Sequence, residues 1–449
     1  MPNAPATASA EGLRDAIAAR LEQTRARTLA LVDQLSEDAL NRVHDPLMSP
    51  IVWDLGHMAA FEDLWLVQNA FGAEPLRAQL EDVYDPFTAP REGRGQLPYL
   101  RSDDCLSYME AVRRRTLECL ARADLSADSE RLLADGYVYE LVLHHEMQHS
   151  ETILQTIQLM TCEPYQPQRA HDPLDAPLAA AGDEMLPVPA GEFEMGADKL
   201  VFSYDNERPP YDVWLDAFRV DRTPVTNGAY IDFIQSGGYQ RAELWSDDGW
   251  RWVQREQRSL PRYWQRDGDT FSIRSFSSWA PADPSLPVCH VSWFEADAYA
   301  RSVGKRLPSE HEWEKAASWS SSSATKQAYP WGEQPSHTGR ANLDQLGFGS
   351  SPGGSYPDGA SPCGALQMIG DVWEWTASRF GAYPDFEPYP YRQYSQEFFG
   401  GPYRVLRGGA WSTQPQAVSS AFRNWDHPDR SQLFAGFRCA LDAEPAARA

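Results

Sequence analysis

Cysteine and long apolar runs are both scarce in this chain of 449 residues, and their scarcity limits the kinds of protein that it can be. Its six cysteines are scattered, and no two of them have the Cys-x-x-Cys spacing of a redox or metal motif. The polar, Ala-rich start lacks the apolar segment of a secretory signal, and no apolar run approaches the roughly 20 residues that cross a bilayer. We therefore expect a soluble, cytoplasmic protein whose thiols are mostly reduced.

Positive charge is scarce as well. Lysine and arginine together number 40 against 64 aspartates and glutamates, which gives a formal net charge of -24 at pH 7. A solvated acidic surface repels DNA, RNA and anionic membranes, so we expect neither nucleic acid nor a membrane as a partner. A small-molecule substrate is favoured instead, and the length predicts roughly two or three domains.

The first 160 residues have the apolar spacing of amphipathic helices. This periodicity predicts four helices, over about residues 11–35, 50–69, 103–123 and 129–160, with Ser49 as the N-cap of the second and Pro50 at its first position. Four helices indicate a bundle, in which side chains on facing helices can build a metal site.

The rest of the chain differs from the first 160 residues in composition and in its apolar pattern. Residues 165–187 are rich in Pro and Ala and predict a linker between a first domain at 1–164 and a second at 188–443, with a tail at 444–449. The second domain has short β-like runs, many Trp, Tyr and Gly residues, and brief helical patches at 294–303 and 310–318. We expect a compact α+β domain there, which makes the whole chain an α+β multidomain protein.

Three histidines form the candidate metal site. His145 and His149 lie four residues apart in a predicted helix, so both imidazoles point to one face. His57 lies in the second predicted helix, and three neutral imidazoles from two helices leave a metal with open positions for substrate. This ligand set suits zinc, iron or copper about equally. His144 is about 100° away around the helix, so we assign it a surface or packing role.

Two other functions fit parts of the pattern. Residues 145–149 also match H-E-x-x-H, in which Glu146 would be the general base of a zinc hydrolase. A third ligand placed downstream on a helix is missing from the sequence, which counts against this alternative. A non-catalytic protein that binds a small ligand is the other alternative, because fold alone does not decide function.

A series of motifs in the second half resembles a known family. The segments at 191–196, 224–227, 305–310, 312–314, 329–332, 368–376, 404–409 and 436–439 occur in the order found in the formylglycine-generating-enzyme domain, a variant of the C-type lectin fold. The first 160 residues resemble the four-helix metal-binding domain known as DinB. Joined in this order, the two resemble the iron-dependent sulfoxide synthases of ergothioneine biosynthesis, including the closely related selenoneine synthase branch. The resemblance covers nearly the whole chain.

This resemblance implies a reaction and part of its site. Iron(II) would be held by the three histidines, and a sulfur donor would be joined to the imidazole C2 of hercynine (N,N,N-trimethylhistidine) with O2 as co-substrate. Gln148 resembles the residue that hydrogen-bonds the substrate imidazole. Asn424 and Trp425 resemble the residues that receive the trimethylammonium and carboxylate end of hercynine, and an aromatic face suits a quaternary ammonium.

The resemblance also implies a proton donor and a site for the sulfur donor. In the family, a tyrosine supplies a proton during oxygen activation. We expect this residue to be Tyr391, with Tyr394 as the second choice and Tyr389 as the third. The positions that bind γ-glutamylcysteine in bacterial members of this family correspond to Arg91, Arg94, Asp426 and Arg430. Forked hydrogen bonds from arginine suit carboxylates of such a donor, which would give a sulfoxide. We therefore expect γ-glutamylcysteine as the donor, with selenoneine synthesis from a selenosugar as the alternative.

Overall fold

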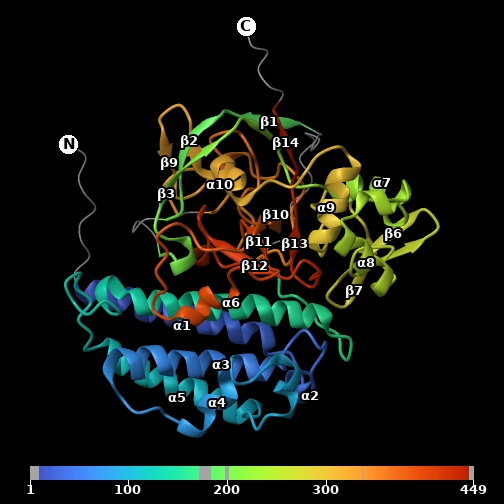
Figure 1. Cartoon of the computed structure of the whole chain (residues 1–449). Helices are drawn as coiled ribbons and strands as arrows, with labels where there is room; N and C mark the ends of the chain where they lie inside the picture. Colours follow the sequence, from blue (N-terminus) through green and yellow to red (C-terminus); the bar gives the residue numbers. More distant parts are fainter. Residues whose placement is uncertain (1–9, 171–183, 198–201, 336, 444–449) are drawn as a thin grey trace. The chain divides into compact units, whose positions relative to one another are not determined.

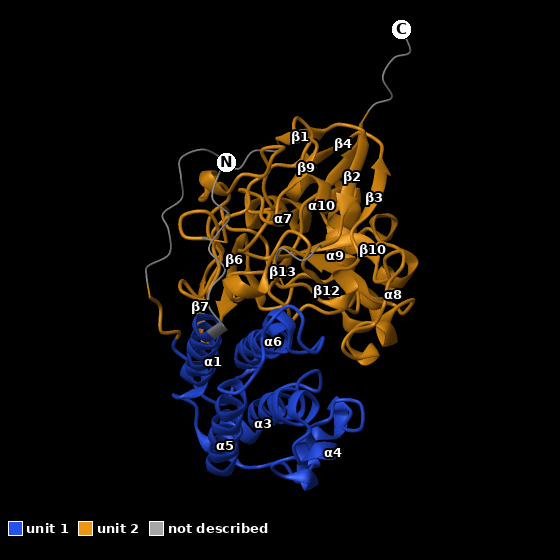
Figure 2. Cartoon of the chain, turned by 90° about the vertical axis from the view of Figure 1, so that its left-hand side faces the viewer, with its two compact units in different colours: residues 1–166 blue, residues 167–449 orange. Residues whose placement is uncertain are grey.

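The computed structural model describes residues 10–170, 184–197, 202–335 and 337–443. The chain divides into two compact units, Met1–Gln166 and Pro167–Ala449 (Figure 2). This division falls within the stretch 165–187 that we expected to be a linker. Of that stretch, residues 171–183 lie outside the described residues, as does the expected tail at 444–449, and the first strand begins at Met185.

Unit 1 is the helical bundle that the periodicity predicts (Figure 1). Its long helices are α1 (Ala10–Val32), α3 (Ile51–Asp63), α5 (Ser102–Leu120) and α6 (Tyr137–Leu159). Short elements connect them: α2 (Glu37–Asn41), the π-helical η1 (Leu64–Asn69), η2 (Ala78–Leu80), α4 (Glu81–Tyr84), η3 (Arg91–Gln96) and η4 (Ala134–Gly136). Helix α1 packs on α6, and α3 packs on both α5 and α6. The helix of His57 therefore contacts the helix of His145 and His149.

The ends of these helices differ from the prediction. The first helix ends at Val32, and the fourth begins only at Tyr137, because Asp135 and Gly136 have positive φ and form a 3₁₀ turn before it. The predicted cap of the second helix is wrong, since Pro50 and not Ser49 is the N-cap of α3. The Ser49 hydroxyl is turned instead toward a buried guanidinium, from which it accepts a hydrogen bond.

Gly56 precedes His57 and makes room for a neighbouring ring. A Cβ at position 56 would lie 2.2 Å from the Tyr84 ring, far inside van der Waals contact. Glycine therefore allows Tyr84, at the end of α4, to approach α3 closely. This approach brings the Tyr84 carbonyl within 2.7 Å of His57 Nδ1.

Unit 2 consists of small sheets and short helices. A four-stranded sheet has the order β12 (Arg423–Asp426), β11 (Arg404–Arg407), β10 (Trp373–Arg379) and β13 (Ala435–Gly436) (Figure 1). The first three strands are antiparallel, and β13 runs parallel to β10. A second sheet of β1 (Met185–Val188), β4 (Phe218–Asp221) and β14 (Ala440–Asp442) joins the first and last described strands.

The remaining strands form antiparallel hairpins. They are β2 (Gly191–Met195) with β3 (Tyr211–Leu215), β5 (Trp264–Asp267) with β6 (Thr270–Ser275) and β7 (Ser278–Pro281), and β8 (Trp319–Ser320) with β9 (Thr325–Lys326). The α-helices are α7 (Asn227–Gln235), α8 (Asp247–Glu256), α9 (Trp293–Ser302) and α10 (Glu310–Ser318). We predicted α9 and α10 but not α7 and α8. Both predicted helices begin with a Ser-x-x-Glu capping box, which is a local signal.

Ion pairs are buried in the core of unit 2. Three arginines with no exposed surface each pair with a glutamate: Arg407 with Glu314, Arg423 with Glu310, and Arg438 with Glu374. The first two pairs join α10 to β11 and β12. They therefore fix the strand that carries Asn424 and Trp425.

Two expectations from composition can also be compared with the structure. All six cysteines lie in the described part of the chain, and none of them forms a disulfide. Among the described helices, none is both long enough and apolar enough to cross a membrane.

Candidate metal centre

The three histidines meet inside unit 1. Helix α3 carries His57, and α6 carries His145 and His149 one turn apart. The Nε2 atoms of His57 and His145 lie 3.2 Å apart, and one ring nitrogen from each of the three histidines falls within 4.8 Å of the others. Such a spacing suits three ligands of a single metal ion, as the i, i+4 pattern and the upstream histidine predict.

Hydrogen bonds on the far side of two rings select the ligand atoms. His57 Nδ1 donates to the Tyr84 carbonyl at 2.7 Å, because a carbonyl can only accept. His149 Nδ1 lies 3.2 Å from Asp54 Oδ1, and a carboxylate likewise accepts its proton. Both rings are thereby held as the tautomer whose Nε2 lone pair is free for a metal.

The surroundings of the histidines are aromatic and dry. The Trp53 ring stacks on His57 with centroids 5.1 Å apart, and the Phe61 ring stacks on His145 at 3.7 Å. Burial, assisted by the positive charge of neighbouring imidazoles, lowers the pKa of His57 and His145 well below the usual value. Neutral imidazoles are the form that binds metals, so the donor set fits a divalent transition metal.

Two neighbours of His145 on α6 point elsewhere. His144 is buried, and its Nε2 lies 4.0 Å from Glu140 Oε2, outside the histidine cluster, so of the two predicted roles, surface or packing, burial fits packing. Glu146 is also buried, and its carboxylate receives hydrogen bonds from Arg25. A carboxylate committed to a guanidinium in the core is not available as the general base of a zinc hydrolase.

The candidate donor-binding arginines differ in their surroundings. Arg91 is exposed, and its Nη1 donates to the Leu47 carbonyl. Arg94 is buried: its Nε donates to the Ala89 carbonyl, its Nη1 donates to Ser49, and Nη2 has no hydrogen-bond partner among the described residues. The Arg94 guanidinium lies 3.8 Å from the centroid of the Trp53 ring, which itself stacks on His57.

Gln148 is the remaining candidate of unit 1. It lies on α6 directly before His149 and is half-buried. Successive residues of a helix are about 100° apart, so Gln148 stands beside the face that carries the ligands.

Several candidates of unit 2 gather around β12. The Trp425 ring stacks on Phe380 at 4.0 Å, and the Tyr394 ring meets it edge-on at 5.8 Å. The Tyr391 ring lies 6.2 Å from that of Tyr394. Asn424, the neighbour of Trp425, is half-buried, and its Oδ1 accepts the backbone N–H of Trp425.

The other candidates of unit 2 have polar contacts of their own. Arg430 Nε lies 3.6 Å from Asp426 Oδ1, so the two form an ion pair. Tyr389 is half-buried, and its backbone N–H donates to Asp205 Oδ2. A sulfur or selenium donor that binds to Asp426 or Arg430 would therefore have to share these side chains with the existing ion pair.

Two partners of the histidines were not predicted. Asp54 lies three residues before His57 and therefore on nearly the same face of α3, a spacing that could have revealed it. The Tyr84 carbonyl carries no signal in the sequence, because any residue type supplies that atom.

The two units match two protein families in turn. Residues 20–153 match the DinB superfamily, and residues 172–443 match the sulfatase-modifying factor enzyme 1-like domain. Separately, the chain is similar to a solved structure of PvdO from Pseudomonas aeruginosa, with 21% identity, 63% of this chain and 100% of that chain covered, and a TM-score of 0.42. The chain is thus a helical DinB domain followed by an α+β domain, as expected.

Relatives of nearly the same length carry both domains. A hercynine oxygenase of Mycobacterium tuberculosis is 44% identical over 431 residues, which cover 95% of this chain and 98% of that protein. A hercynine oxygenase of Mycolicibacterium smegmatis is 40% identical over 437 residues, which cover 96% and 99%. The chain belongs to the hercynine oxygenase family and is an oxygenase. The alternatives of a zinc hydrolase and of a non-catalytic binding protein are therefore wrong.

Replacing any one of His57, His145 and His149 by Ala should abolish stoichiometric metal binding, because two imidazoles remain where three converge. Elemental analysis after loading with Co(II) and gel filtration measures the loss. His144→Asn is the matched control, since His144 lies on the same helix outside the cluster, and this variant should keep its metal. Full occupancy in all three Ala variants would exclude this site.

Asp54→Asn should weaken metal binding without removing a ligand. The variant keeps the size of the side chain but loses the negative charge that accepts the His149 Nδ1 proton. We expect the affinity for Co(II) to fall about 10- to 100-fold, the usual effect of losing such an outer carboxylate. Isothermal titration measures it, with Asp38→Asn, an exposed partner of Arg42 in the same unit, as control. An unchanged affinity would show that Asp54 does not orient His149.

Proposed function

We propose that the chain is a non-haem iron(II) oxygenase that joins γ-glutamylcysteine to the imidazole C2 of hercynine and gives a sulfoxide, a step of ergothioneine biosynthesis in the cytoplasm. The observation that carries the proposal is the convergence of three histidine side chains from α3 and α6. The names of the two relatives support hercynine as the substrate.

The overall reaction consumes one O2. The C2–H and S–H bonds break and a C–S bond forms, which removes two electrons, and oxidation of sulfur to the sulfoxide removes two more. One oxygen atom stays on sulfur, and the other leaves as water with the two protons. Iron(II) on the three histidines would supply the open coordination positions and redox capacity that this oxidation requires.

The residues of unit 1 would prepare this site. Tyr84 and Asp54 hold the Nδ1 protons of His57 and His149, so that Nε2 of each ring faces the ion without reorganisation. Trp53 and Phe61 exclude water from the buried side of two of the ligands. Gln148 would donate to or accept from the imidazole of hercynine and so orient its C2 toward the sulfur donor.

Trp425 and Asn424 would receive the other end of hercynine. Phe380 covers one face of the Trp425 indole, so a trimethylammonium group would meet the opposite face. The Asn424 amide would bind the carboxylate through its Nδ2, because its Oδ1 already accepts the backbone N–H of Trp425.

The proposed proton donor is Tyr391, ahead of Tyr394 and Tyr389. A phenol has a pKa of about 10 and is protonated at pH 7, which suits a general acid. The contact of Tyr391 and Tyr394 with the cluster that includes Trp425 supports both over Tyr389.

Binding of the sulfur donor is proposed for Arg91, Arg94, Asp426 and Arg430. Exposed Arg91 and the open Nη2 of Arg94 could receive carboxylates, and Asp426 could receive the ammonium group. One observation favours a second candidate, a selenoneine synthase that uses a selenosugar. Two nitrogens of Arg94 are already satisfied, and Asp426 is paired with Arg430, so these groups have less capacity for a highly charged donor.

Incubation of iron-loaded protein with hercynine, O2 and one donor at a time separates these candidates. We expect mass spectrometry to show a C–S product with γ-glutamylcysteine and much less with cysteine, because cysteine lacks the γ-glutamyl carboxylate for Arg91 and Arg94. A product with the selenosugar alone would assign selenoneine synthesis. Absence of any product, with O2 unconsumed, would refute the oxygenase proposal.

Substituting the proton donor should redirect the reaction. Tyr391→Phe removes one hydroxyl from a half-buried ring, so iron and hercynine binding should stay within about twofold, while C–S bond formation falls by about 100-fold or more, the range for a lost general acid. Oxidation of the donor without attachment to the ring should then dominate the products. Tyr394→Phe and Tyr389→Phe are the controls, and normal product from all three would place the acid elsewhere.

A further inference from the structure

Four charged side chains meet in the core of unit 1 and take no part in the proposed chemistry. They are Arg25 of α1, Glu62 of α3, Arg113 of α5 and Glu146 of α6, so each long helix contributes one charge. Their side chains are between 0% and 8% exposed. We call this group the ionic quartet.

The contacts of the ionic quartet form a closed chain across the bundle. Arg25 donates from Nε to Glu146 at 2.8 Å and from Nη2 to Glu62 at 2.9 Å. Arg113 donates from Nε and Nη2 to the two oxygens of Glu62, at 2.8 and 3.0 Å, and from Nη2 to Glu146 at 3.5 Å. Burial alone would raise the pKa of Glu62, but the charges of Arg113 and Arg25 lower it below its usual value. Two positive and two negative charges thus compensate each other.

The ionic quartet adjoins the histidine cluster along the chain. Glu146 directly follows the ligand His145 on α6, and Glu62 directly follows Phe61 on α3. The Phe61 ring stacks on the His145 ring at 3.7 Å. Any rotation of α6 that moved Glu146 away from Arg25 would therefore also turn His145 away from Phe61 and His57.

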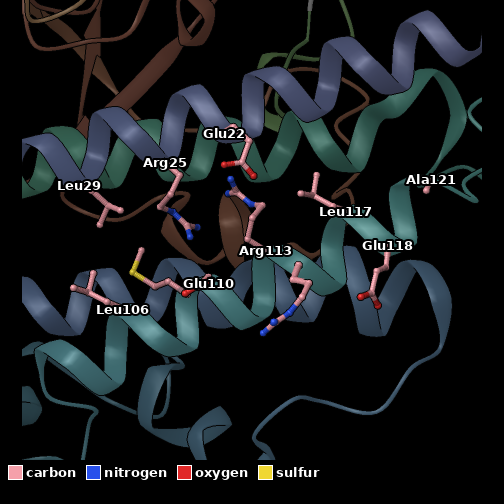
Figure 3. Close-up of a pocket in the computed structure, with 11 residues that line it drawn as sticks. Glu22, Arg25, Leu29, Leu106, Glu110, Arg113, Leu117, Glu118 and Ala121 are labelled. Atoms are coloured by element: carbon pink, nitrogen blue, oxygen red, sulfur yellow. The ribbon is translucent and has the colours of Figure 1, made fainter.

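The space between α1 and α5 is only partly filled beside the ionic quartet. A groove of about 790 Å³ runs between the two helices and reaches Arg25 and Arg113, which both project into the space between them (Figure 3). Its walls include Leu29, Leu106 and Leu117. Across this space Arg113 Nη1 donates to the Leu21 carbonyl of α1, and the ion pairs of the quartet tie both helices to α3 and α6.

Energetics favour a geometric role for these charges. Replacing a buried ion-pair cluster by apolar residues of similar volume is often neutral or stabilising, so net stability is a weak reason to have one. Forked guanidinium–carboxylate contacts, in contrast, tolerate little change of distance or angle. Unlike an apolar core, the ionic quartet defines the rotation and register of the four helices.

We infer that the ionic quartet is a positioning device for the metal centre: it sets the rotation of α6 against α3 and thereby the affinity and geometry of the three-histidine site. This inference rests on the proposed metal centre. Arg25 and Glu146 are positioning residues, since no contact of theirs reaches a ligand atom in the described structure.

Two variants test the inference in the full-length chain. Arg25→Lys keeps the charge but loses the fork that joins Glu62 to Glu146. The fourfold variant Arg25→Met, Glu62→Leu, Arg113→Met and Glu146→Leu replaces the ionic quartet by apolar side chains, and the apo protein should melt at or above the wild-type temperature. Both variants should bind Co(II) at least about tenfold more weakly, with altered visible absorption bands, because the ligands are no longer held in register.

The matched control is the pair of Arg20 and Glu140. It joins the same helices α1 and α6, with Arg20 Nη2 2.7 Å from Glu140 Oε2, but lies away from the histidine cluster. The double variant Arg20→Gln and Glu140→Gln should retain the wild-type Co(II) affinity and spectrum even where its melting temperature falls.

The outcomes separate the inference from the proposed function. If the variants of the ionic quartet bind Co(II) with the wild-type affinity and spectrum, the inference is overturned and the proposed function stands. If the control pair loses affinity as strongly as Arg25→Lys, any ion pair between α1 and α6 has this effect, and the specific role is overturned as well. If the wild-type protein binds no metal, the proposed function itself fails.

Discussion

Charge buried at the centre of a helical bundle is the constraint on which the structure of unit 1 depends. Glu62 and Glu146 place carboxyl groups in the core, and each pairs there with arginine, because an unpaired carboxylate in this setting is very unfavourable. Among the described residues, the ion-pair partners are Arg25 and Arg113, which come from the two long helices that do not carry the histidines. Few arrangements of the four helices can therefore pair all four buried charges. The arrangement found also brings His57 next to His145.

The sequence predicts the ligands of the metal centre but not what holds them. His145 and His149 follow from helical spacing, and His57 follows from its place in a second amphipathic helix. Arg25 and Arg113 look, from their own helices, like residues of a solvated face, since α1 and α5 carry many other charges. Their burial depends on helices far away in the chain. Long-range pairing of this kind has no local signature in the sequence. The same holds for Ser49, whose hydroxyl accepts a hydrogen bond from Arg94 and does not cap a helix.

In unit 2 the recognisable motifs belong mainly to the framework. The segment 404–409 contains Arg407, which is buried against Glu314, and Gly408, whose φ of 92° and close approach to the Met368 carbonyl exclude a side chain. Glu374 in the segment 368–376 accepts from both Trp313 and Arg438. These residues identify the fold strongly because the fold cannot form without them. The candidate substrate residues around β12 are half-buried. Packing of the fold restricts the residue type less at such positions than in the core.

If Arg94 binds the donor as proposed, its surroundings connect donor binding to the metal centre. Its guanidinium lies over the Trp53 ring, and that indole also stacks on the ring of His57, so Trp53 links Arg94 to a ligand of the metal centre. A carboxylate bound at the open Nη2 would sit on a rigid support, because Ser49 and the Ala89 carbonyl already fix the guanidinium plane. Arg94 therefore cannot follow a smaller or larger donor by moving. Under the proposed function, discrimination between donors would therefore fall to other residues such as Arg91, which is exposed, and specificity could change there without disturbing the histidines.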